Sequence, residues 1–515
     1  MNGAQVLIRT FVDSGVDVCF ANPGTSEMHF VAALDDVPEM RAVLGLFEGV
    51  VTGAADGYGR MAGRPAATLL HLGPGLGNGI ANLHNARRAR TPLVNVVGDH
   101  ATTHLAHDPP LASDIESLAR PVSRWFRSSG STDALAADAV DAVRGAFGPP
   151  GGVATLVVPA DLSWMEAGSP ASSRPSAVLA TVNDDAVVGA AKALRSGEPV
   201  VLLVGGNAVR ERGLVAAGRV ANATGAKLLC ETFPARMERG AGIPAVERLG
   251  YLAEFTIAQL QGARHLILAD ALAPVSFFAY PGIPGYLVPD GCTVHTLATG
   301  SDDVAGALEA LADAVGTPSG IATSEPASRP DRPTGALNAQ TLAAAIGALL
   351  PEGAVVSDEG NTSGIFVSGA TAGAPRHDWL CLTGGAIGQG LPVATGAAVA
   401  CPDRPVLSLE ADGSAMYTLQ SLWTQVRESL DVTTVVLNNG SYAILELELS
   451  RVGAGDPGPR ARDMLDLKHP ELDFVALASG MGVPAARATT AEEFTTQLER
   501  ALSTPGPALV EAVLR

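Results

Sequence analysis

Short apolar runs rich in Val and Leu alternate along the chain with Ala-rich stretches of helical character. Runs this short and this apolar are typical of strands buried on both faces, as in a parallel sheet covered by helices. The pattern predicts strands at residues 66–70, 93–97, 200–204, 406–409 and 432–437. The N-terminal stretch MNGAQVLIRTFVDSGV has the spacing of an amphipathic helix.

Two stretches dense in Pro, Ser and Gly interrupt this alternation, at residues 166–177 and 317–335. Such a composition is typical of linkers. They divide the chain into residues 1–165, 178–316 and 336–515, and each part keeps the alternation of strand and helix. The sequence therefore predicts three α/β domains, each built on a parallel sheet.

The composition narrows the range of partners. The 515 residues are 47% hydrophobic and 17% charged, as in a well-packed globular protein. A formal net charge of −19 would repel nucleic acid and anionic membranes, which favours small-molecule ligands. The five cysteines are scattered, the first residues lack the pattern of a signal peptide, and no apolar run is long enough for a membrane span. We therefore expect a cytoplasmic protein.

A lone carboxylate and a pair of amides stand at the ends of two neighbouring predicted strands. Asp412 follows one strand in SLEADGS, and Asn439 follows the next in LNNGS, 439 − 412 = 27 residues later. That distance fits one crossover helix, expected near residues 417–430, and one return strand. Both side chains would meet at the carboxyl edge of the sheet, where helix N-termini bind phosphate. A carboxylate, an amide oxygen and a backbone carbonyl form a partial ligand set for Mg²⁺, so we expect a diphosphate held with this metal.

Two glycine-rich turns must be tested for dinucleotide binding. GPGLGNG (73–79) and GGAIGQG (384–390) do not match G-x-G-x-x-G in register, which argues against a Rossmann dehydrogenase. The Asp-Gly-Ser…Asn-Asn pair instead resembles the diphosphate and magnesium motif of thiamine diphosphate (ThDP) enzymes. Three further segments are similar to that family: FEGVVTGAADGYGRMAGRPA (47–66), LLHLGPGLGNGIANLHNA (69–86) and LTGGAIGQGLPVATGAA (382–398).

This resemblance implies three doubly wound parallel-sheet domains in the order pyrimidine-binding (1–165), middle (178–316) and diphosphate-binding (336–515). NPGTSEMHF (22–30) and the context of His71 bring the chain nearest to benzoylformate decarboxylase and to the acetolactate synthase large-subunit group. In this family the pyrimidine domain of one subunit faces the diphosphate domain of another. The resemblance therefore implies a homodimer or homotetramer with active sites at the subunit interface.

The resemblance assigns Glu48 as the catalytic glutamate. Its carboxyl group would hydrogen-bond N1′ of the aminopyrimidine and so favour the imino tautomer that removes the thiazolium C2 proton. The apolar flanks LGLF and VVTGAA predict that Glu48 is buried, which would raise its pKa. A solvated glutamate at a helix N-terminus is the alternative.

The other catalytic candidates come from the first domain. His71 matches an active-site histidine of benzoylformate decarboxylase and would relay a proton near C2, although lone histidines are often structural. Thr25 stands where that family has a serine and would bind the substrate carboxylate, or it is only a turn threonine. His100, in GDHATTH, is a third candidate, while His104 and His107 of the same loop could be solvent-exposed.

The cofactor contacts also follow from the resemblance. Mg²⁺ would be bound by Asp412, Asn439 and the Ser441 carbonyl, and Ile387 would hold the cofactor in its bent form. Further cofactor contacts fall on Asn361, Thr362, Gly385, Gly413, Ser414, Asn439, Ser441 and Tyr442. One departure is Ala411, where the family usually has Gly; its methyl group is a small intrusion.

On the substrate side, the second histidine of benzoylformate decarboxylase is absent. The corresponding stretch reads APVSFFAYPG (273–282), in which Phe277, Phe278 and Tyr280 would line an apolar acyl pocket or fill the domain core. Losing a proton donor favours attack of the acyl-anion equivalent on a second carbonyl. We therefore expect a decarboxylase and carboligase that forms an acyloin or acetohydroxy acid from a 2-oxo acid and a carbonyl acceptor.

Two alternatives stay open: a decarboxylase that releases an aldehyde, and a non-catalytic paralogue that only binds ThDP. FAD is also left open. The acetolactate synthases bind it with the middle domain, here around LLVGGNAVRERG (202–213), but the simple decarboxylases lack it. ThDP and Mg²⁺ are expected in every case.

Overall fold

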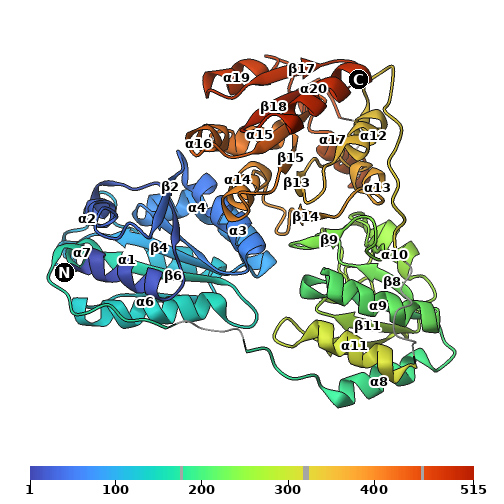
Figure 1. The fold of residues 1–515 in the computed structure, drawn as a ribbon, viewed down its shortest axis with the longest axis horizontal. Helices are drawn as coiled ribbons and strands as arrows, with labels where there is room; N and C mark the ends of the chain where they lie inside the picture. The colour runs from blue at the N-terminus through green and yellow to red at the C-terminus, as the bar shows by residue number, and fades with distance from the viewer. Residues whose placement is uncertain (174–177, 317–323, 454–456, 515) are drawn as a thin grey trace.

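The computed structural model describes residues 1–173, 178–316, 324–453 and 457–514. Its three lobes, coloured blue to cyan, green to yellow and orange to red in Figure 1, each contain one sheet. The predicted linkers 166–177 and 317–335 lie partly outside the described residues, at 174–177 and 317–323. Among the described helices, none is long and apolar enough to cross a membrane.

The first sheet has six parallel strands in the order β2-β1-β3-β4-β6-β5. Its strands are β1 (Val18–Ala21), β2 (Arg41–Leu44), β3 (Ala66–Leu70), β4 (Leu93–Asp99), β5 (Trp125–Ser128) and β6 (Val153–Pro159). Its helices are α1 (Gly3–Asp13), α2 (Met28–Ala33), α3 (Glu48–Ala62), α4 (Leu72–Ala89), α5 (Ile115–Ala119), α6 (Thr132–Phe147) and α7 (Ala160–Trp164). The central strand β3 is buried along its whole length, which explains its unbroken apolar sequence.

The second sheet has five parallel strands in the order β10-β8-β7-β11-β12. Its strands are β7 (Val200–Val204), β8 (Lys227–Cys230), β10 (Glu247–Arg248), β11 (His265–Ala269) and β12 (Thr293–Ala298). Its helices are α8 (Asp184–Leu194), α9 (Glu211–Thr224), α10 (Ala253–Leu260) and α11 (Val304–Ala314). The chain leaves β7 toward β8 on one side and returns to β11 on the other, so β7 lies at the topological switch point.

The third sheet has seven strands in the order β17-β18-β16-β15-β13-β14-β9. Its strands are β9 (Met237–Arg239), β13 (Val355–Glu359), β14 (His377–Cys381), β15 (Val406–Ala411), β16 (Val432–Asn438), β17 (Ala485–Ala488) and β18 (Ala508–Val513). Its helices are α12 (Ala339–Leu349), α13 (Val367–Ala370), α14 (Gly390–Ala400), α15 (Asp412–Thr418), α16 (Ser421–Arg427), α17 (Ala443–Arg451), α18 (Pro459–Asp463), α19 (Phe474–Gly480) and α20 (Ala491–Ser503).

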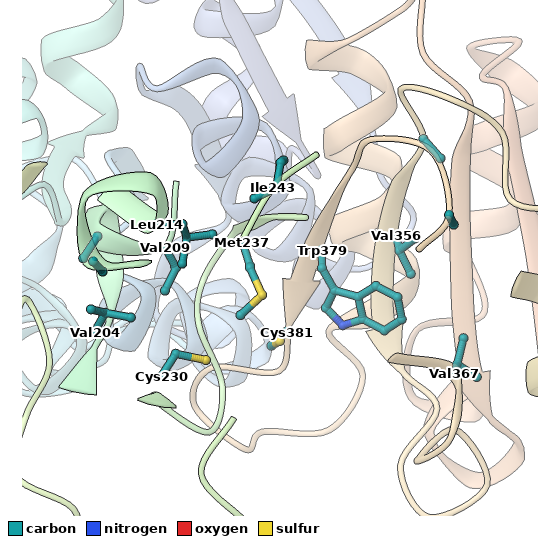
Figure 2. Packing of buried hydrophobic residues seen from close by; sticks show 14 of the residues in the cluster. Val204, Val209, Leu214, Cys230, Met237, Ile243, Val356, Val367, Trp379 and Cys381 are labelled. Atoms are coloured by element: carbon teal, nitrogen blue, oxygen red, sulfur yellow. The ribbon is translucent and has the colours of Figure 1, made fainter. Parts of the chain in front are cut away.

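One strand of the third sheet comes from the middle part of the chain. β9 pairs antiparallel with β14, and it carries Met237 into an apolar cluster that also holds Val209, Trp379 and Cys381. Figure 2 shows Met237 between the valine and leucine side chains of the middle domain and the indole ring of Trp379. The middle and third domains therefore share a core, although the predicted boundaries separate them along the chain.

Helices α3 and α14 pack against each other between the first and third sheets (Figure 1). A side chain at Gly57 would lie 2.1 Å from the carbonyl oxygen of Val393, and one at Gly396 would lie 1.8 Å from that of Ala54. Only glycine permits so close an approach. This packing fixes Glu48, the first residue of α3, relative to the glycine-rich loop that precedes α14.

Most of the predicted elements are present. Strands 66–70 and 200–204 match β3 and β7, and the N-terminal helix is α1. The single crossover helix expected near residues 417–430 is wrong, because two shorter helices, α15 and α16, cover this stretch and the first begins at Asp412. The first helix follows directly on β15, which ends at Ala411, and the carboxylate of its first residue Asp412 accepts the Gly413 N–H, 2.8 Å away.

Candidate active site

Glu48 opens α3, directly after the extended residue Phe47. Its Oε2 atom accepts a hydrogen bond from Nδ2 of Asn78, 3.0 Å away on α4. The predicted burial is wrong for the single chain, in which Glu48 is only half-buried. The flanking valines pack inward, but the first turn of a helix leaves its leading side chain at the end of the element. The carboxylate therefore stays accessible to a ligand.

The first turn of α4 brings Glu48 and His71 close to the same residue, Gly75. A side chain at Gly75 would lie 3.1 Å from Oε1 of Glu48 and 3.4 Å from Cβ of His71. Between His71 and this turn, the buried Leu72 has a φ of 51°, a conformation that is strained for a branched side chain. Such strain is concentrated at functional sites, which agrees with a site at this turn.

His71 is held by a buried carboxylate. Its Nδ1 atom lies 2.8 Å from Oε2 of Glu27, and the Ser26 hydroxyl lies 3.2 Å from the same nitrogen. The Ser26 hydroxyl also donates to Oε1 of Glu27, 2.5 Å away, and the Gly24 N–H donates to Oε2, 2.8 Å away. Within the described chain Nε2 of His71 has no hydrogen-bond partner. The imidazole thus contacts Glu27 through Nδ1, and 21% of its side chain is exposed.

Two glycines make room for this arrangement. A side chain at Gly98, in β4, would lie 1.8 Å from Oε1 of Glu27, and one at Gly24 would overlap the His71 ring at 2.2 Å. Neither Ser26 nor Glu27 was among the sequence candidates. The sequence does place a glutamate two residues beyond Thr25, in a segment that already held a candidate. Its contact with His71 could not be predicted, because the two residues are 44 positions apart.

Thr25 and His100, the two other catalytic candidates of the first domain, lie in different surroundings. Thr25 is exposed, and its neighbour Ser26 makes the contact with His71 instead. His100 follows β4 at the carboxyl edge of the first sheet, and its buried Nε2 has no hydrogen-bond partner among the described residues. Its ring lies 5.7 Å from that of His104, which in turn lies 5.9 Å from His107. The structure does not bring His100 into hydrogen-bonding contact with Glu27 or His71.

The predicted convergence at the edge of the third sheet is confirmed. Asp412, which is 2% exposed, accepts the Gly440 N–H on Oδ2 at 2.7 Å, next to Asn439. Parallel pairing of β15 with β16 places both strand ends together. Burial raises the pKa of Asp412, while N–H groups that include those of Gly413 and Gly440 act to lower it.

The predicted polar contacts surround this carboxylate. Nδ2 of Asn361 donates to the Ser414 hydroxyl at 2.9 Å, and Nδ2 of Asn439 donates to the Ser363 hydroxyl at 3.1 Å. Oδ1 of Asn439 accepts the Ser441 N–H at 2.9 Å. Asn361 has a φ of 46°, so its turn is bent in a left-handed conformation. Thr362 is half-buried in the same turn.

Tyr442 lies against the first turn of α15. A side chain at Gly413 would lie 2.4 Å from Cε1 of Tyr442, so this position accommodates only glycine. Gly413 was predicted to contact the cofactor, and in this structure its N–H donates to the Asp412 carboxylate. The backbone of Ser441 is held from outside, because residues 440–442 pair with residues 465–467.

The glycine-rich loop before α14 is fastened to α4. Asn85 donates to the Ala386 carbonyl oxygen at 2.8 Å and accepts the Ala386 N–H at 3.2 Å. Gly385 has a φ of 74°, with open space where a side chain would stand. Ile387 is half-buried and belongs to none of the apolar clusters of the described residues, so it is not a core isoleucine. Its side chain is available to a ligand.

Two carboxyl groups brace this loop from behind. Glu359 accepts the N–H groups of Gly388 and Gly390 at 2.8 and 2.6 Å. Glu410 lies beside it and accepts the Ser408 hydroxyl at 2.7 Å. Burial raises the pKa of Glu359 to about 7, and burial together with the neighbouring Glu359 raises that of Glu410 well above its ordinary value. At neutral pH the pair therefore holds a proton.

Phe277 and Phe278 do not fill the core of the middle domain, since 44% and 57% of their surfaces are exposed. The Tyr280 hydroxyl donates to Oε2 of Glu448 at 2.6 Å, and the Arg451 guanidinium lies 4.8 Å from the centre of the tyrosine ring. Segment 273–282 is therefore fastened to α17, the helix that follows the Asn439 loop. The segment itself contains no histidine.

The polar groups at the carboxyl edge of the third sheet fit a diphosphate and a divalent cation. Asp412 supplies one buried carboxylate, Asn439 and Ser441 supply neutral oxygens, and the turns at Asn361 and Gly385 leave open backbone beside them. The described part of the chain has no group of three or more His, Cys, Asp or Glu side chains arranged for a metal. A cation here would need further oxygen ligands, which diphosphate and water provide.

The comparisons with known proteins agree with this geometry. Residues 1–118 match the family described as thiamine pyrophosphate enzyme, N-terminal TPP binding domain, and residues 358–512 match the corresponding C-terminal TPP binding domain. The chain belongs to the thiamine pyrophosphate enzyme family.

The chain is similar to proteins with two kinds of name. The chain is 61% identical over 515 residues to a Mycobacterium tuberculosis H37Rv protein provisionally named acetolactate synthase large subunit IlvX, covering 100% of this chain and 99% of that protein. It is 30% identical to benzoylformate decarboxylase of Pseudomonas aeruginosa, with 96% of each covered. A solved structure, the ThDP-dependent 4-hydroxybenzoylformate decarboxylase of Rhodococcus jostii RHA1, has a TM-score of 0.86 at 26% identity and covers 100% of this chain and 99% of that one.

Proposed function

We propose that this enzyme uses ThDP and Mg²⁺ to decarboxylate a 2-oxo acid and then protonates the product, releasing an aldehyde. The single observation that carries this proposal is the Glu27–His71 pair at 2.8 Å, since it supplies the proton donor that aldehyde release requires. The resemblance to two decarboxylases over nearly the whole chain supports it.

ThDP, when bound, would stabilise the acyl carbanion equivalent that remains after loss of CO₂. Asp412, Asn439 and the Ser441 carbonyl would hold the cation, and Asn361, Ser414 and the loop at Gly385 would contact the diphosphate. Ile387 would press on the cofactor from the third domain. Glu48 would hydrogen-bond the aminopyrimidine nitrogen and exchange a proton with it.

Glu27 would act on His71 rather than on substrate. A carboxylate that accepts the Nδ1 proton fixes the tautomer and the ring orientation, and it stabilises the imidazolium form. The proton carried on Nε2 would then be available to the acyl carbon. Ser26 would support Glu27 through its short hydrogen bond.

Carboligation is the second candidate, and it was the expectation from the sequence. It is favoured by segment 273–282, which offers Phe277, Phe278 and Tyr280 but no histidine, and by the 61% identity to a protein provisionally named an acetolactate synthase subunit. Both candidates share the decarboxylation step. They differ only in whether a proton or a second carbonyl reaches the acyl carbon first.

We also propose that the active site is completed by a second copy of the chain. Glu48 is half-buried, Asn361 is exposed, and Ile365 and Phe366 beside it are 67% and 47% exposed in the single chain. Large apolar side chains at the edge of a polar site are typical of a surface that another protein covers. The expected assembly is a homodimer or a homotetramer.

The test is a product analysis with the purified protein, ThDP, Mg²⁺ and a panel of 2-oxo acids: pyruvate, 2-oxobutyrate, benzoylformate, 4-hydroxybenzoylformate and indolepyruvate. Mass spectrometry would quantify aldehydes and acyloins together. Aldehyde as the main product supports the proposal, and acyloin or acetohydroxy acid as the main product would replace it by carboligation. A protein that binds ThDP but consumes no 2-oxo acid would be the non-catalytic paralogue.

A further inference from the structure

The carboxyl ends of the middle sheet form a crevice at its switch point. In open α/β sheets this is where dinucleotides bind, with their diphosphate on free N–H groups of the turn that follows the central strand. Here that turn is Gly205 and the 3₁₀ helix Gly206–Val209, directly after β7. It also belongs to the stretch 202–213, where the resemblance to acetolactate synthases left open whether the chain binds FAD.

The N–H groups of this turn are already occupied. Gly206 donates to Oε1 of Glu231 at 2.8 Å, and Asn207 donates to Oδ2 of Asp270 at 2.9 Å. Glu231 follows β8 and Asp270 follows β11, the two strands that flank β7. Two carboxylates of the chain therefore stand where the diphosphate of a dinucleotide would stand.

The guanidinium of Arg90, from the first domain, lies against the middle domain at this crevice. Nη1 of Arg90, at the end of α4, donates to Oδ1 of Asp270 at 2.5 Å. The guanidinium lies so close to the middle domain that a side chain at Gly206 would be 2.5 Å from its Nη2 and one at Gly300 would be 2.1 Å from its Nη1. The Asp270 side chain is 2% exposed in this pair, whereas the Arg90 side chain is 35% exposed, so the carboxylate is the buried partner.

The burial of Glu231 and Asp270 disfavours a further negative charge, such as a phosphate group, beside them. Burial raises the pKa of Glu231 to about 7, and burial also raises the pKa of Asp270 although Arg90 opposes it. A diphosphate brought beside these two groups would meet carboxyl oxygen atoms at the backbone N–H groups that it needs. Both carboxyl groups would have to leave the N–H groups they now accept before phosphate could reach them.

The space that remains between the two domains is a cavity of about 240 Å³, lined in part by Arg60, Arg210 and Arg236. Arg60 is paired with Asp56, and Arg236 with Asp378, at 2.5 Å each. Nη1 of Arg210 has no hydrogen bond in the described structure and lies 3.9 Å from Asp378. This volume is below the roughly 300–1,000 Å³ of pockets that bury a drug-sized ligand, so the cavity is small for a dinucleotide.

We infer that the middle domain of this protein binds no flavin: Glu231 and Asp270 replace a dinucleotide diphosphate at the β7 turn, and Arg90 uses Asp270 to fasten the first domain to the middle domain. The crevice that serves as a cofactor site in other α/β sheets is here a fixed joint between domains. This inference stands whether the reaction ends in an aldehyde or an acyloin.

The first experiment incubates the wild-type holoprotein, with ThDP and Mg²⁺, with excess FAD and in parallel with excess ADP. Gel filtration and the flavin absorbance spectrum then measure retained FAD, calorimetry measures ADP binding, and thermal unfolding is recorded with each ligand. We expect no retained flavin, no ADP binding and no shift in the melting temperature. Stoichiometric flavin, saturable ADP binding or a ligand-dependent rise in melting temperature would overturn the inference.

The second experiment tests the joint. Arg90→Ala leaves Asp270 buried without its cation, whereas Asp270→Asn keeps an oxygen for the Asn207 N–H and removes only the charge pair. We expect both variants to melt a few degrees below the wild type, with Arg90→Ala the lower. The exposed Arg88, two residues earlier on the same helix, gives the matched control Arg88→Ala. Melting of Arg90→Ala at the temperature of Arg88→Ala would show that the pair is not a joint.

Discussion

Nδ1 of His71 lies 2.8 Å from Oε2 of Glu27, a carboxylate of which only 3% of the side chain is exposed. The two residues come from turns after β1 and β3, which are neighbouring parallel strands, so the sheet itself brings them together. A buried carboxylate beside one imidazole nitrogen leaves the other nitrogen to exchange protons with a ligand. This relationship is the basis of the proposed aldehyde release.

Glu27→Gln should lower kcat by about 10²-fold to 10⁴-fold, since an amide cannot stabilise the imidazolium form and allows the wrong tautomer. ThDP affinity should be unchanged, because Glu27 lies away from the diphosphate site. Ser26→Ala removes one supporting hydrogen bond and should cause a smaller loss. Steady-state kinetics with parallel ThDP titrations would check this, and equal losses in the two variants would contradict a special role for Glu27.

Glu48→Gln should abolish most turnover while ThDP still binds, and Asp412→Asn should abolish most turnover by weakening the binding of the cation and the cofactor. If each site combines Glu48 of one chain with Asp412 of another, mixing the two inactive variants should restore activity. Half of the sites in such a heterodimer are intact. A mixture as inactive as its components, with subunit exchange demonstrated by mass spectrometry, would place both residues in the site of one chain.

Asp412→Asn should weaken Mg²⁺ and ThDP binding by more than the roughly 10–100-fold that loss of an outer-shell partner causes. The amide keeps one oxygen but loses the charge, and its NH₂ group would face the Gly440 N–H that Oδ2 now accepts. Isothermal titration calorimetry measures the affinity. Asp403→Asn, an exposed aspartate just before β15, is the matched control and should bind as the wild type does.

The Glu359–Glu410 pair predicts a pH dependence of stability. Both carboxyl groups have raised pKa values in the folded protein, that of Glu359 about 7 against an ordinary 4.5. Between these values the folded state binds more protons than the unfolded state, so stability falls as the pH rises through this range. Asp358, which also faces the pair, acts in the same direction.

Glu410→Gln removes one of these ionisable groups and keeps an acceptor for the Ser408 hydroxyl. It should raise the melting temperature near pH 7 by a few degrees and flatten its decline with rising pH. Glu352→Gln, at an exposed position, serves as the control. An unchanged slope in Glu410→Gln, measured by differential scanning calorimetry from pH 5 to about pH 8, would show that the pair does not share a proton.

The fold was largely predictable because buried parallel strands are read directly as short apolar runs. β3 and β7 match their predicted bounds, and the convergence of Asp412 with the Asn439 loop follows from parallel strand ends alone. The break between α15 and α16 was not predicted, since no proline or glycine marks it. Nor was β9, a three-residue strand that joins the sheet of another domain.

The site was predictable in part. His71, Asp412 and the glycine-rich loop carry local signals, namely a position after a buried strand or an unusual run of glycines. Glu27 carries only its position two residues beyond Thr25, because its role depends on a contact 44 residues away and on the absence of a side chain at Gly98. Glu48 begins a helix, as in the alternative interpretation, and its predicted burial is wrong for the single chain because its exposure depends on surroundings that the flanking sequence does not describe.

The most direct test of the account is the ratio of aldehyde to acyloin that the wild type and Glu27→Gln form from the best 2-oxo acid of the panel. With a saturating aldehyde acceptor present, the wild type should release mainly aldehyde. Glu27→Gln should shift the ratio toward acyloin, because slower protonation of the acyl carbon gives the acceptor more time to react with it. A wild type that forms mainly acyloin, or a ratio that is the same in both proteins, would contradict the claim that Glu27 and His71 supply that proton.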